Sequence, residues 1–280
     1  MGDSDTQGEQ PQQPVALVTG GSRGIGAETA VALAERGYDV FITYRNKAAR
    51  AREVVARIEA IGRRANALAS DITAPEEPAR LLRAVADWGD GQLDLLVLNA
   101  SGGLERELVA ADPRYPQRIN RDAQVALVEA ALPIMPAGSS IVFVTSHWAH
   151  LYGQVEQLPA YEAVASSKHA GEVALRARQE AFTAAGIRLL VVTGDLIEGT
   201  ITPKLLERVT PGLAGSRRGG RAADRCRDGP GHRPGGDGHL TGKRADTRHR
   251  RRAGLHAPAP VSSRESATGI TTGRLAGMIK

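Results

Sequence analysis

The chain has 280 residues, a formal net charge of +5 and a single cysteine, Cys226. One cysteine excludes an internal disulfide framework and is typical of a reducing, cytoplasmic setting. The first 14 residues are polar and have neither a basic start nor an apolar run. We therefore expect a disordered tail at residues 1–14, with no signal peptide and no membrane partner.

The positive charge is concentrated in one segment. Residues 216–252 hold 12 Lys and Arg against four Asp, which leaves 24 basic against 27 acidic residues elsewhere. This segment has no aromatic residues to stack on bases, so we expect no nucleic-acid partner. Residues 213–280 form an atypical Arg/Gly-rich segment with two explanations open: a disordered tail, or a stretch translated out of its natural frame.

Short apolar runs alternate with helical stretches through the first two-thirds of the chain. We expect strands at residues 15–18, 40–43, 65–69, 93–98, 141–145 and 189–193, and helices at 26–36, 48–61, 76–88, 117–132 and 164–184. Apolar strands separated by helices predict an α/β fold, a Rossmann-type doubly wound parallel sheet in a domain of residues 15–212. Six strands are clear, and a final strand is not evident.

A glycine-rich turn follows the first expected strand and opens the first helix. Glycine tolerates the sharp reversal and lets a pyrophosphate approach the backbone, while the helix N-terminus offers unpaired N–H groups. This context predicts dinucleotide binding by Gly20, Ser22, Arg23, Gly24, Ile25 and Gly26.

The second strand ends in Tyr44-Arg45-Asn46, where an acidic residue would select NAD. An arginine suits the 2′-phosphate of NADP instead, and Arg23 adds a second positive charge. We therefore expect the cofactor to be NADP.

Further motifs in the same order resemble the short-chain dehydrogenase/reductase family over about residues 15–202. The resemblance implies an NADP-dependent oxidoreductase that is a homodimer or homotetramer. It places Asp71 and Ile72 at the adenine, Asn99 and Ala100 beside the cofactor, and Leu196 at the carboxamide. It also implies that Asn120 holds a proton-relay water, Ser146 binds the substrate carbonyl and Lys168 grips the nicotinamide ribose.

One departure concerns the catalytic acid. The family has a tyrosine four residues before the lysine, where this chain has Val164. The nearest phenol, Tyr161, precedes Lys168 by seven residues, about 10 Å along a helix. Three interpretations stay open: Tyr161 begins in a loop and folds back to the site, reduction proceeds without a protein phenol, or the site is catalytically silent and the chain is an NADP-binding regulatory protein.

A ketone with a neighbouring phenol would carry its own proton source. The chain is similar to an atypical subgroup of short-chain reductases that tailor angucyclinone- and simocyclinone-type aromatic polyketides in antibiotic biosynthesis. The resemblance implies a polycyclic aromatic ketone or quinone as substrate. His147 is an alternative proton donor or a wall residue, and Trp148 and Tyr152 either stack on the substrate or pack in the protein.

Overall fold

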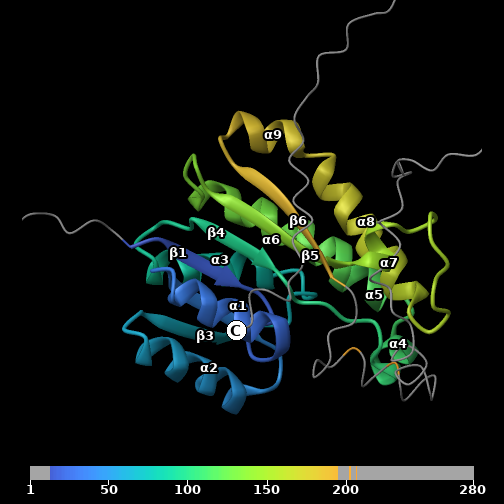
Figure 1. Cartoon of the computed structure of the whole chain (residues 1–280), viewed down its shortest axis with the longest axis horizontal. Helices are drawn as coiled ribbons and strands as arrows, with labels where there is room; N and C mark the ends of the chain where they lie inside the picture. Colours follow the sequence, from blue (N-terminus) through green and yellow to red (C-terminus); the bar gives the residue numbers. More distant parts are fainter. Residues whose placement is uncertain (1–12, 195–201, 203–205, 207–280) are drawn as a thin grey trace, which may run out of the picture. The chain divides into compact units, whose positions relative to one another are not determined.

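Six strands pair in parallel within the described part of the chain and form one sheet (Figure 1). The computed structural model describes residues 13–194, 202 and 206. The strands are β1 (Val15–Val18), β2 (Asp39–Tyr44), β3 (Ala65–Ala69), β4 (Leu95–Leu98), β5 (Ser140–Ser146) and β6 (Arg188–Gly194). They lie in the order β3-β2-β1-β4-β5-β6, with every pair parallel. The predicted strands and doubly wound sheet are confirmed.

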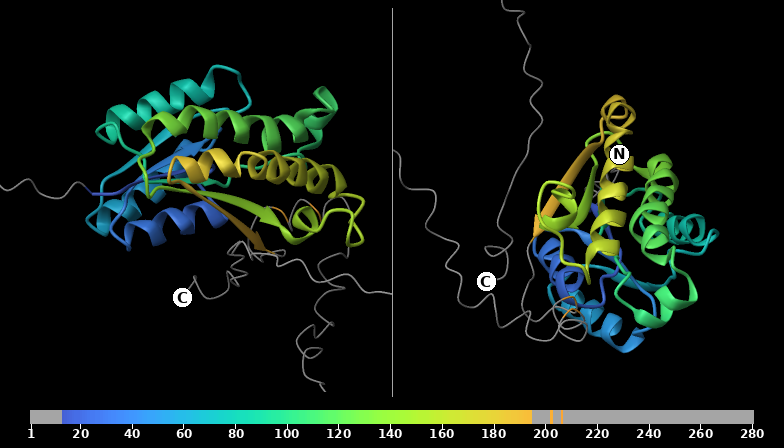
Figure 2. Two further views of the ribbon diagram at one scale, coloured as in Figure 1. Left: turned by 90° about the horizontal axis from the view of Figure 1, so that it is seen from above. Right: turned by 90° about the vertical axis from the view of Figure 1, so that its right-hand side faces the viewer.

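Helices cover both faces of this sheet (Figure 2). On one face α1 (Gly24–Ala34) and α2 (Ala48–Ala60) pack on Val18 and its neighbours. On the other face α3 (Glu77–Trp88), α6 (Ala123–Ala131) and α8 (Glu162–Arg176) pack on Leu17 and its neighbours. Successive residues of a strand point to opposite faces of the sheet. The nearly continuous apolar sequence of these strands is therefore buried on both faces.

The chain order of the strands reverses between β1 and β4. Crossovers leave these two strands in opposite directions, so a crevice opens at their carboxyl ends. Ligands of doubly wound folds bind at this position, which is where the glycine-rich turn lies.

Two predicted helices are divided in the structure. The expected helix at residues 117–132 consists of α5 (Tyr115–Gln117), the π-helical turn η1 (Arg118–Asp122), α6 and the 3₁₀ turn η2 (Leu132–Ile134). Gly171 of α8 permits the π-turn, because a Cβ there would lie 2.2 Å from the Asn120 carbonyl oxygen. The expected helix at 164–184 divides into α8 and α9 (Gln179–Ala184), and the turn between them buries Phe182 in the core.

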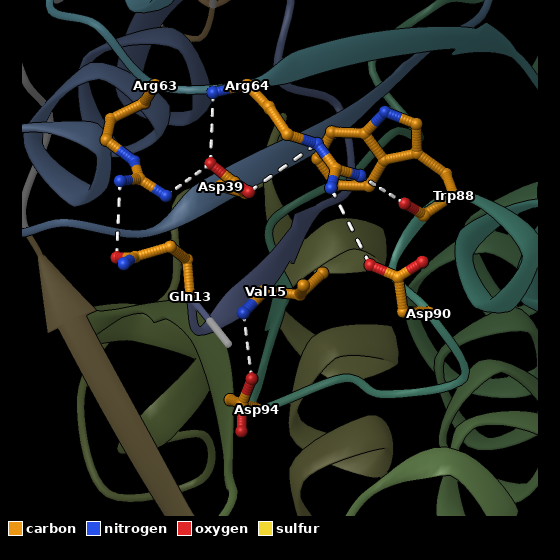
Figure 3. A network of polar contacts seen from close by, with 8 residues as sticks. All are labelled: Gln13, Val15, Asp39, Arg63, Arg64, Trp88, Asp90 and Asp94. Carbon is orange, nitrogen blue, oxygen red and sulfur yellow. Dashed lines mark hydrogen bonds and ion pairs between the residues drawn. The ribbon is translucent and has the colours of Figure 1, made fainter. Parts of the chain in front are cut away.

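A polar network lies at the amino-terminal ends of the strands, opposite the crevice at their carboxyl ends (Figure 3). The buried Asp39 carboxylate accepts hydrogen bonds from the Arg63 side chain at 2.5 Å and the Arg64 backbone N–H at 3.0 Å. The Arg64 guanidinium lies 4.8 Å from the Trp88 ring centroid and 3.7 Å from Asp90. These contacts join the start of β2 to the turn before β3 and the end of α3.

Among the residues described, no helix is long and apolar enough to cross a membrane, and no cluster of side chains suited to a metal ion is present. The predictions for Leu196, residues 213–280 and nearly all of residues 1–14 lie outside the described residues.

Candidate active site

A cavity of about 750 Å³ lies at the carboxyl ends of β1, β2, β4 and β5. It brings together most of the residues predicted from the sequence: Gly20, Ser22, Arg23, Gly24, Ile25, Gly26, Arg45, Asp71, Ile72, Asn99, Ala100, Ser146, Tyr161 and Lys168. The expected cofactor site and the expected catalytic site therefore share one continuous cleft.

The glycine-rich turn has the geometry of a phosphate cradle. Gly20 has φ +66° and Gly24 has φ +55°, a backbone conformation that side chains disfavour. A Cβ on Gly26 would lie 2.5 Å from both the Asn99 amide nitrogen and the Gly20 carbonyl oxygen. α1 begins at Gly24, and its N-cap residue Arg23 makes no side-chain capping bond. The first backbone N–H groups of α1 therefore face the cleft with the positive end of the helix dipole.

Thr19 ties this turn to the loop after β4. Its hydroxyl accepts hydrogen bonds from the backbone N–H groups of Asn99 and Ala100, both at 3.0 Å. The Asn99 side chain donates in return to the Thr19 carbonyl at 2.9 Å. Asn99 thus fixes the shape of the cleft. Thr19 begins the predicted glycine-rich turn, but no role was predicted for its side chain, since a buried threonine at a strand end has no distinctive pattern.

Four basic side chains line the cofactor end of the cavity. Two were predicted, Arg23 and Arg45, and two were not, Lys47 and Arg50 at the start of α2. The sequence does carry a signal for them, because basic residues recur at positions 47 and 50 shortly after Arg45. Such a concentration of positive charge favours a ligand with several phosphate groups.

The Arg45 guanidinium crosses the cleft. Its Nη1 donates to the Tyr115 hydroxyl at 2.6 Å, and its Nη2 lies 4.0 Å from the Glu105 carboxylate. Burial raises the pKa of Tyr115, and nearby Glu105 raises it further. Neither Tyr115 nor Glu105 was predicted, because both lie about 60 or more residues after Arg45 in the sequence.

Ser146 and Tyr161 meet in the cavity. Ser146 ends β5 and caps the short helix α7 (His147–His150) by accepting from the Ala149 N–H at 3.2 Å. Tyr161 precedes the first turn of α8 and is buried at 5% exposure. Burial raises the pKa of the Tyr161 phenol, and the neighbouring Ser146 hydroxyl offsets part of that rise. The phenol therefore stays protonated at neutral pH and can donate to a carbonyl oxygen.

Val164 occupies the helical position four residues before Lys168. It is buried and packs against the loop after β4, where a Cβ on Gly103 would lie 3.0 Å from a Val164 methyl group. One side of Val164 is therefore packed on this loop, while the side chain also lines the cavity.

Lys168 is a buried ammonium group on α8. Its Nζ donates to the Val144 carbonyl at 3.1 Å. Burial disfavours the charged form and lowers the pKa of Lys168 from 10.5 to about 8. The amine remains mainly protonated at neutral pH. Lys168 lines the same cavity as Ser146 and Tyr161.

Asn120 lies in the π-helical turn and binds the loop after β4. Its amide oxygen accepts from the Ser101 hydroxyl at 3.0 Å, and its amide nitrogen donates to the Gly102 carbonyl at 2.9 Å and to Ser167 at 3.0 Å. The side chain connects this loop to α8. The proton-relay water expected at Asn120 stays a prediction.

Residues 14–209 match the family model described as short chain dehydrogenase. The chain belongs to this family. A 1-cyclohexenylcarbonyl-CoA reductase of Streptomyces collinus is 32% identical over 190 residues, 67% of this chain and 66% of the relative. A hydroxynaphthalene reductase of Aspergillus fumigatus is 36% identical over 163 residues, 56% of this chain and 57% of the relative. The chain thus spans less than two thirds of the length of either curated relative.

The crystal structure of a short chain dehydrogenase from Burkholderia cenocepacia J2315 in complex with NADP has the same fold. It is 36% identical, with a TM-score of 0.59 over 66% of this chain and 75% of that chain.

Of the aromatic rings that follow Ser146 closely in the sequence, Trp148 forms part of the wall of this short-chain dehydrogenase site. The Trp148 side chain is buried and meets the Tyr161 ring edge-on, with 5.7 Å between centroids. His147 is exposed and is absent from the described residues that line the cavity. The geometry therefore supports Tyr161, rather than His147, as the proton donor. Tyr152 packs 5.7 Å from the His169 ring, outside that lining.

Proposed function

We propose that the chain is an NADPH-dependent carbonyl reductase in which Ser146 and Tyr161 bind and protonate the substrate oxygen. The observation that carries this proposal is the placement of Ser146 and Tyr161 together in the cleft that also holds Lys168 and the glycine-rich turn. Of the three interpretations of the missing tyrosine, this placement favours the displaced phenol.

The residues at the cofactor end fit NADP. The cradle at Gly26 excludes even a methyl group, α1 presents uncapped N–H groups to a pyrophosphate, and Arg23 and Arg45 suit a 2′-phosphate. The Lys168 ammonium suits the hydroxyls of the nicotinamide ribose. When bound, NADPH supplies a hydride to the substrate.

The protein's own part is to orient the carbonyl and supply a proton. The Ser146 hydroxyl donates a hydrogen bond to the carbonyl oxygen, which polarises the C=O bond. As the hydride reaches the carbon, Tyr161 transfers its phenolic proton to the oxygen, and the carbonyl becomes an alcohol. The phenolate then regains a proton from solvent. The reduced positive charge of Lys168 at alkaline pH would weaken this arrangement.

We further propose a flat polycyclic aromatic ketone or quinone as substrate, of the angucyclinone type. Trp148, Tyr161 and Val164 give the catalytic end of the cavity an apolar, partly aromatic wall. Fused aromatic rings pack well on such a wall. The relative named a hydroxynaphthalene reductase supports a hydroxylated aromatic substrate.

A second candidate is reduction of a carbon–carbon double bond conjugated to a thioester. The relative named a 1-cyclohexenylcarbonyl-CoA reductase supports it. Chemically, the same two hydroxyl groups that stabilise an alkoxide also stabilise the enolate oxygen formed by conjugate reduction.

The deciding experiment mixes purified full-length protein with NADPH and two substrate sets. One set contains hydroxylated naphthoquinones, anthraquinones and tetralones, and the other contains cyclohexenyl and linear enoyl-CoA thioesters. Loss of the reduced-nicotinamide absorbance is followed, and deuterated NADPH labels the product. Deuterium on a carbinol carbon supports carbonyl reduction, and deuterium β to a thioester supports the second candidate. NADPH binding without turnover of either set contradicts both and favours the regulatory alternative.

A further inference from the structure

Tyr115 holds the cofactor-selecting arginine from across the cleft. It begins α5, and its side chain is buried at 3% exposure with its hydroxyl 2.6 Å from Arg45 Nη1. The loop after β4 packs directly on this phenol, since a Cβ on Gly102 would lie 2.9 Å from the hydroxyl oxygen. The phenol is thereby fixed, and its hydrogen bond orients one edge of the guanidinium away from solvent.

Glu105 approaches the same guanidinium from the loop after β4. One carboxylate oxygen lies 4.0 Å from Arg45 Nη2, and the other accepts from the Gly103 N–H at 2.8 Å. The Glu105 side chain is 27% exposed and that of Arg45 is 34% exposed. The carboxylate is therefore held at the cleft and offsets part of the arginine's positive charge there.

A 2′-phosphate and a ribose hydroxyl make different demands on this group. A phosphate dianion binds best to two parallel N–H donors of one guanidinium and is repelled by a neighbouring carboxylate. A free 2′-hydroxyl can donate to a carboxylate and accept from an arginine. The Tyr115 hydrogen bond occupies Arg45, and the Glu105 carboxylate lies beside it. Both contacts thus weaken binding of a 2′-phosphate without weakening binding of a 2′-hydroxyl.

We propose that Tyr115 and Glu105 are specificity-determining residues that compete with the 2′-phosphate for Arg45 and keep the chain able to accept NADH as well as NADPH. This inference rests on the proposed function, in which Arg45 meets the 2′-phosphate. It assigns a cofactor-discriminating role to Glu105 in the loop after β4 and to Tyr115 in α5, for which the sequence motifs predicted no role.

The test measures binding by calorimetry, independently of turnover. Adenosine 2′,5′-diphosphate carries the distinguishing phosphate, and 5′-AMP lacks it. Full-length wild type is compared with Tyr115→Phe, Glu105→Gln and Arg45→Ala, with Tyr152→Phe as the matched control outside the cavity lining. Thermal unfolding verifies that each variant is folded.

We expect Tyr115→Phe and Glu105→Gln each to tighten binding of adenosine 2′,5′-diphosphate by roughly three- to tenfold, since each removes one competing contact. Binding of 5′-AMP should change less than about twofold, and Arg45→Ala should weaken the diphosphate by more than about tenfold. If diphosphate binding is unchanged or weaker in both Tyr115→Phe and Glu105→Gln, and is still weakened in Arg45→Ala, this inference is overturned. The NADP proposal then stays intact. Unchanged binding in Arg45→Ala overturns the assignment of Arg45 and the inference with it. A wild type that binds neither the diphosphate nor NADPH overturns the proposed function itself.

Discussion

Tyr161 lies beside Ser146 in the cleft although it precedes Lys168 by seven residues rather than four. This placement is possible because Tyr161 lies just before α8, with φ −113° and ψ −8°. Its N–H donates to the Leu158 carbonyl at 2.8 Å, which turns the chain before the helix begins. The phenol thus reaches the end of β5 from a turn and does not need to share a helical face with the lysine.

Replacing Tyr161 by Phe should lower kcat for carbonyl reduction by about 10²- to 10⁴-fold, the usual contribution of a positioned general acid. NADPH affinity should stay unchanged, because the phenol lies at the substrate end of the cleft. Single-turnover rates and NADPH fluorescence titration measure the two effects separately. Tyr152→Phe is the control and should retain the full rate.

A retained rate in Tyr161→Phe would support a different proton source, namely a phenol on the substrate next to its own ketone. Substrates with and without that neighbouring hydroxyl distinguish the two routes. Under our proposal, both substrates lose rate in the variant. Under the substrate-assisted route, only the substrate without the hydroxyl is slow, and it is equally slow in the wild type.

Restoring a tyrosine at the family's usual position should destabilise the fold. In Val164→Tyr the larger side chain must share the catalytic end of the cavity with buried Trp148 and Tyr161, because the Gly103 loop already packs against a Val164 methyl group. Overpacking of this kind costs about 1–3 kcal/mol. Thermal unfolding measures it, with Val173→Tyr as the control, because Val173 is 51% exposed on the same helix. Equal melting temperatures for the two variants would contradict the packing argument.

The sheet was predictable because each strand is an apolar run that is too short to form a helix. The phosphate turn was predictable because the backbone conformation at Gly20 and Gly24 requires glycine in a fixed spacing. Local pattern determines both features.

The parts that the sequence did not predict depend on contacts between distant segments. The π-turn at Asn120 depends on a glycine in α8, and the orientation of Arg45 depends on Tyr115. Whether Tyr161 could reach Ser146 depended on where α8 begins, and the helical pattern placed that boundary only at Val164. Boundaries and long-range side-chain contacts carry no periodic signal.

The Asp39 network should contribute substantially to stability. In Asp39→Asn, an amide replaces a buried carboxylate that binds Arg63 and the backbone of Arg64. Breaking such a pair leaves a partly buried guanidinium uncompensated, so we expect a loss of about 2–4 kcal/mol in unfolding free energy. Glu28→Gln is the control, since its pair with Arg57 is exposed and should contribute at most about 1 kcal/mol. Urea denaturation compares them, and similar losses in both variants would contradict the prediction.

Burial of Lys168 should make the protein less stable at neutral than at mildly alkaline pH. The pKa of Lys168 is about 8 in the folded state and near 10.5 when unfolded. Below about pH 8 both states carry the proton, and the fold bears the cost of a buried ammonium. Between these two pKa values only the unfolded state stays protonated, so this residue adds up to about 1.4 kcal/mol of stability per pH unit.

Lys168→Met should therefore raise the unfolding free energy at about pH 7 by roughly 2–3 kcal/mol while weakening NADPH binding. The advantage of the variant should shrink toward pH 10, because the wild-type amine is then neutral in the folded state. Urea denaturation of both proteins at about pH 7, 8 and 9.5 measures this difference, with the exposed Lys47→Met as control. A stability difference between wild type and Lys168→Met that stays constant over this range would show that the amine titrates alike in the folded and unfolded chain.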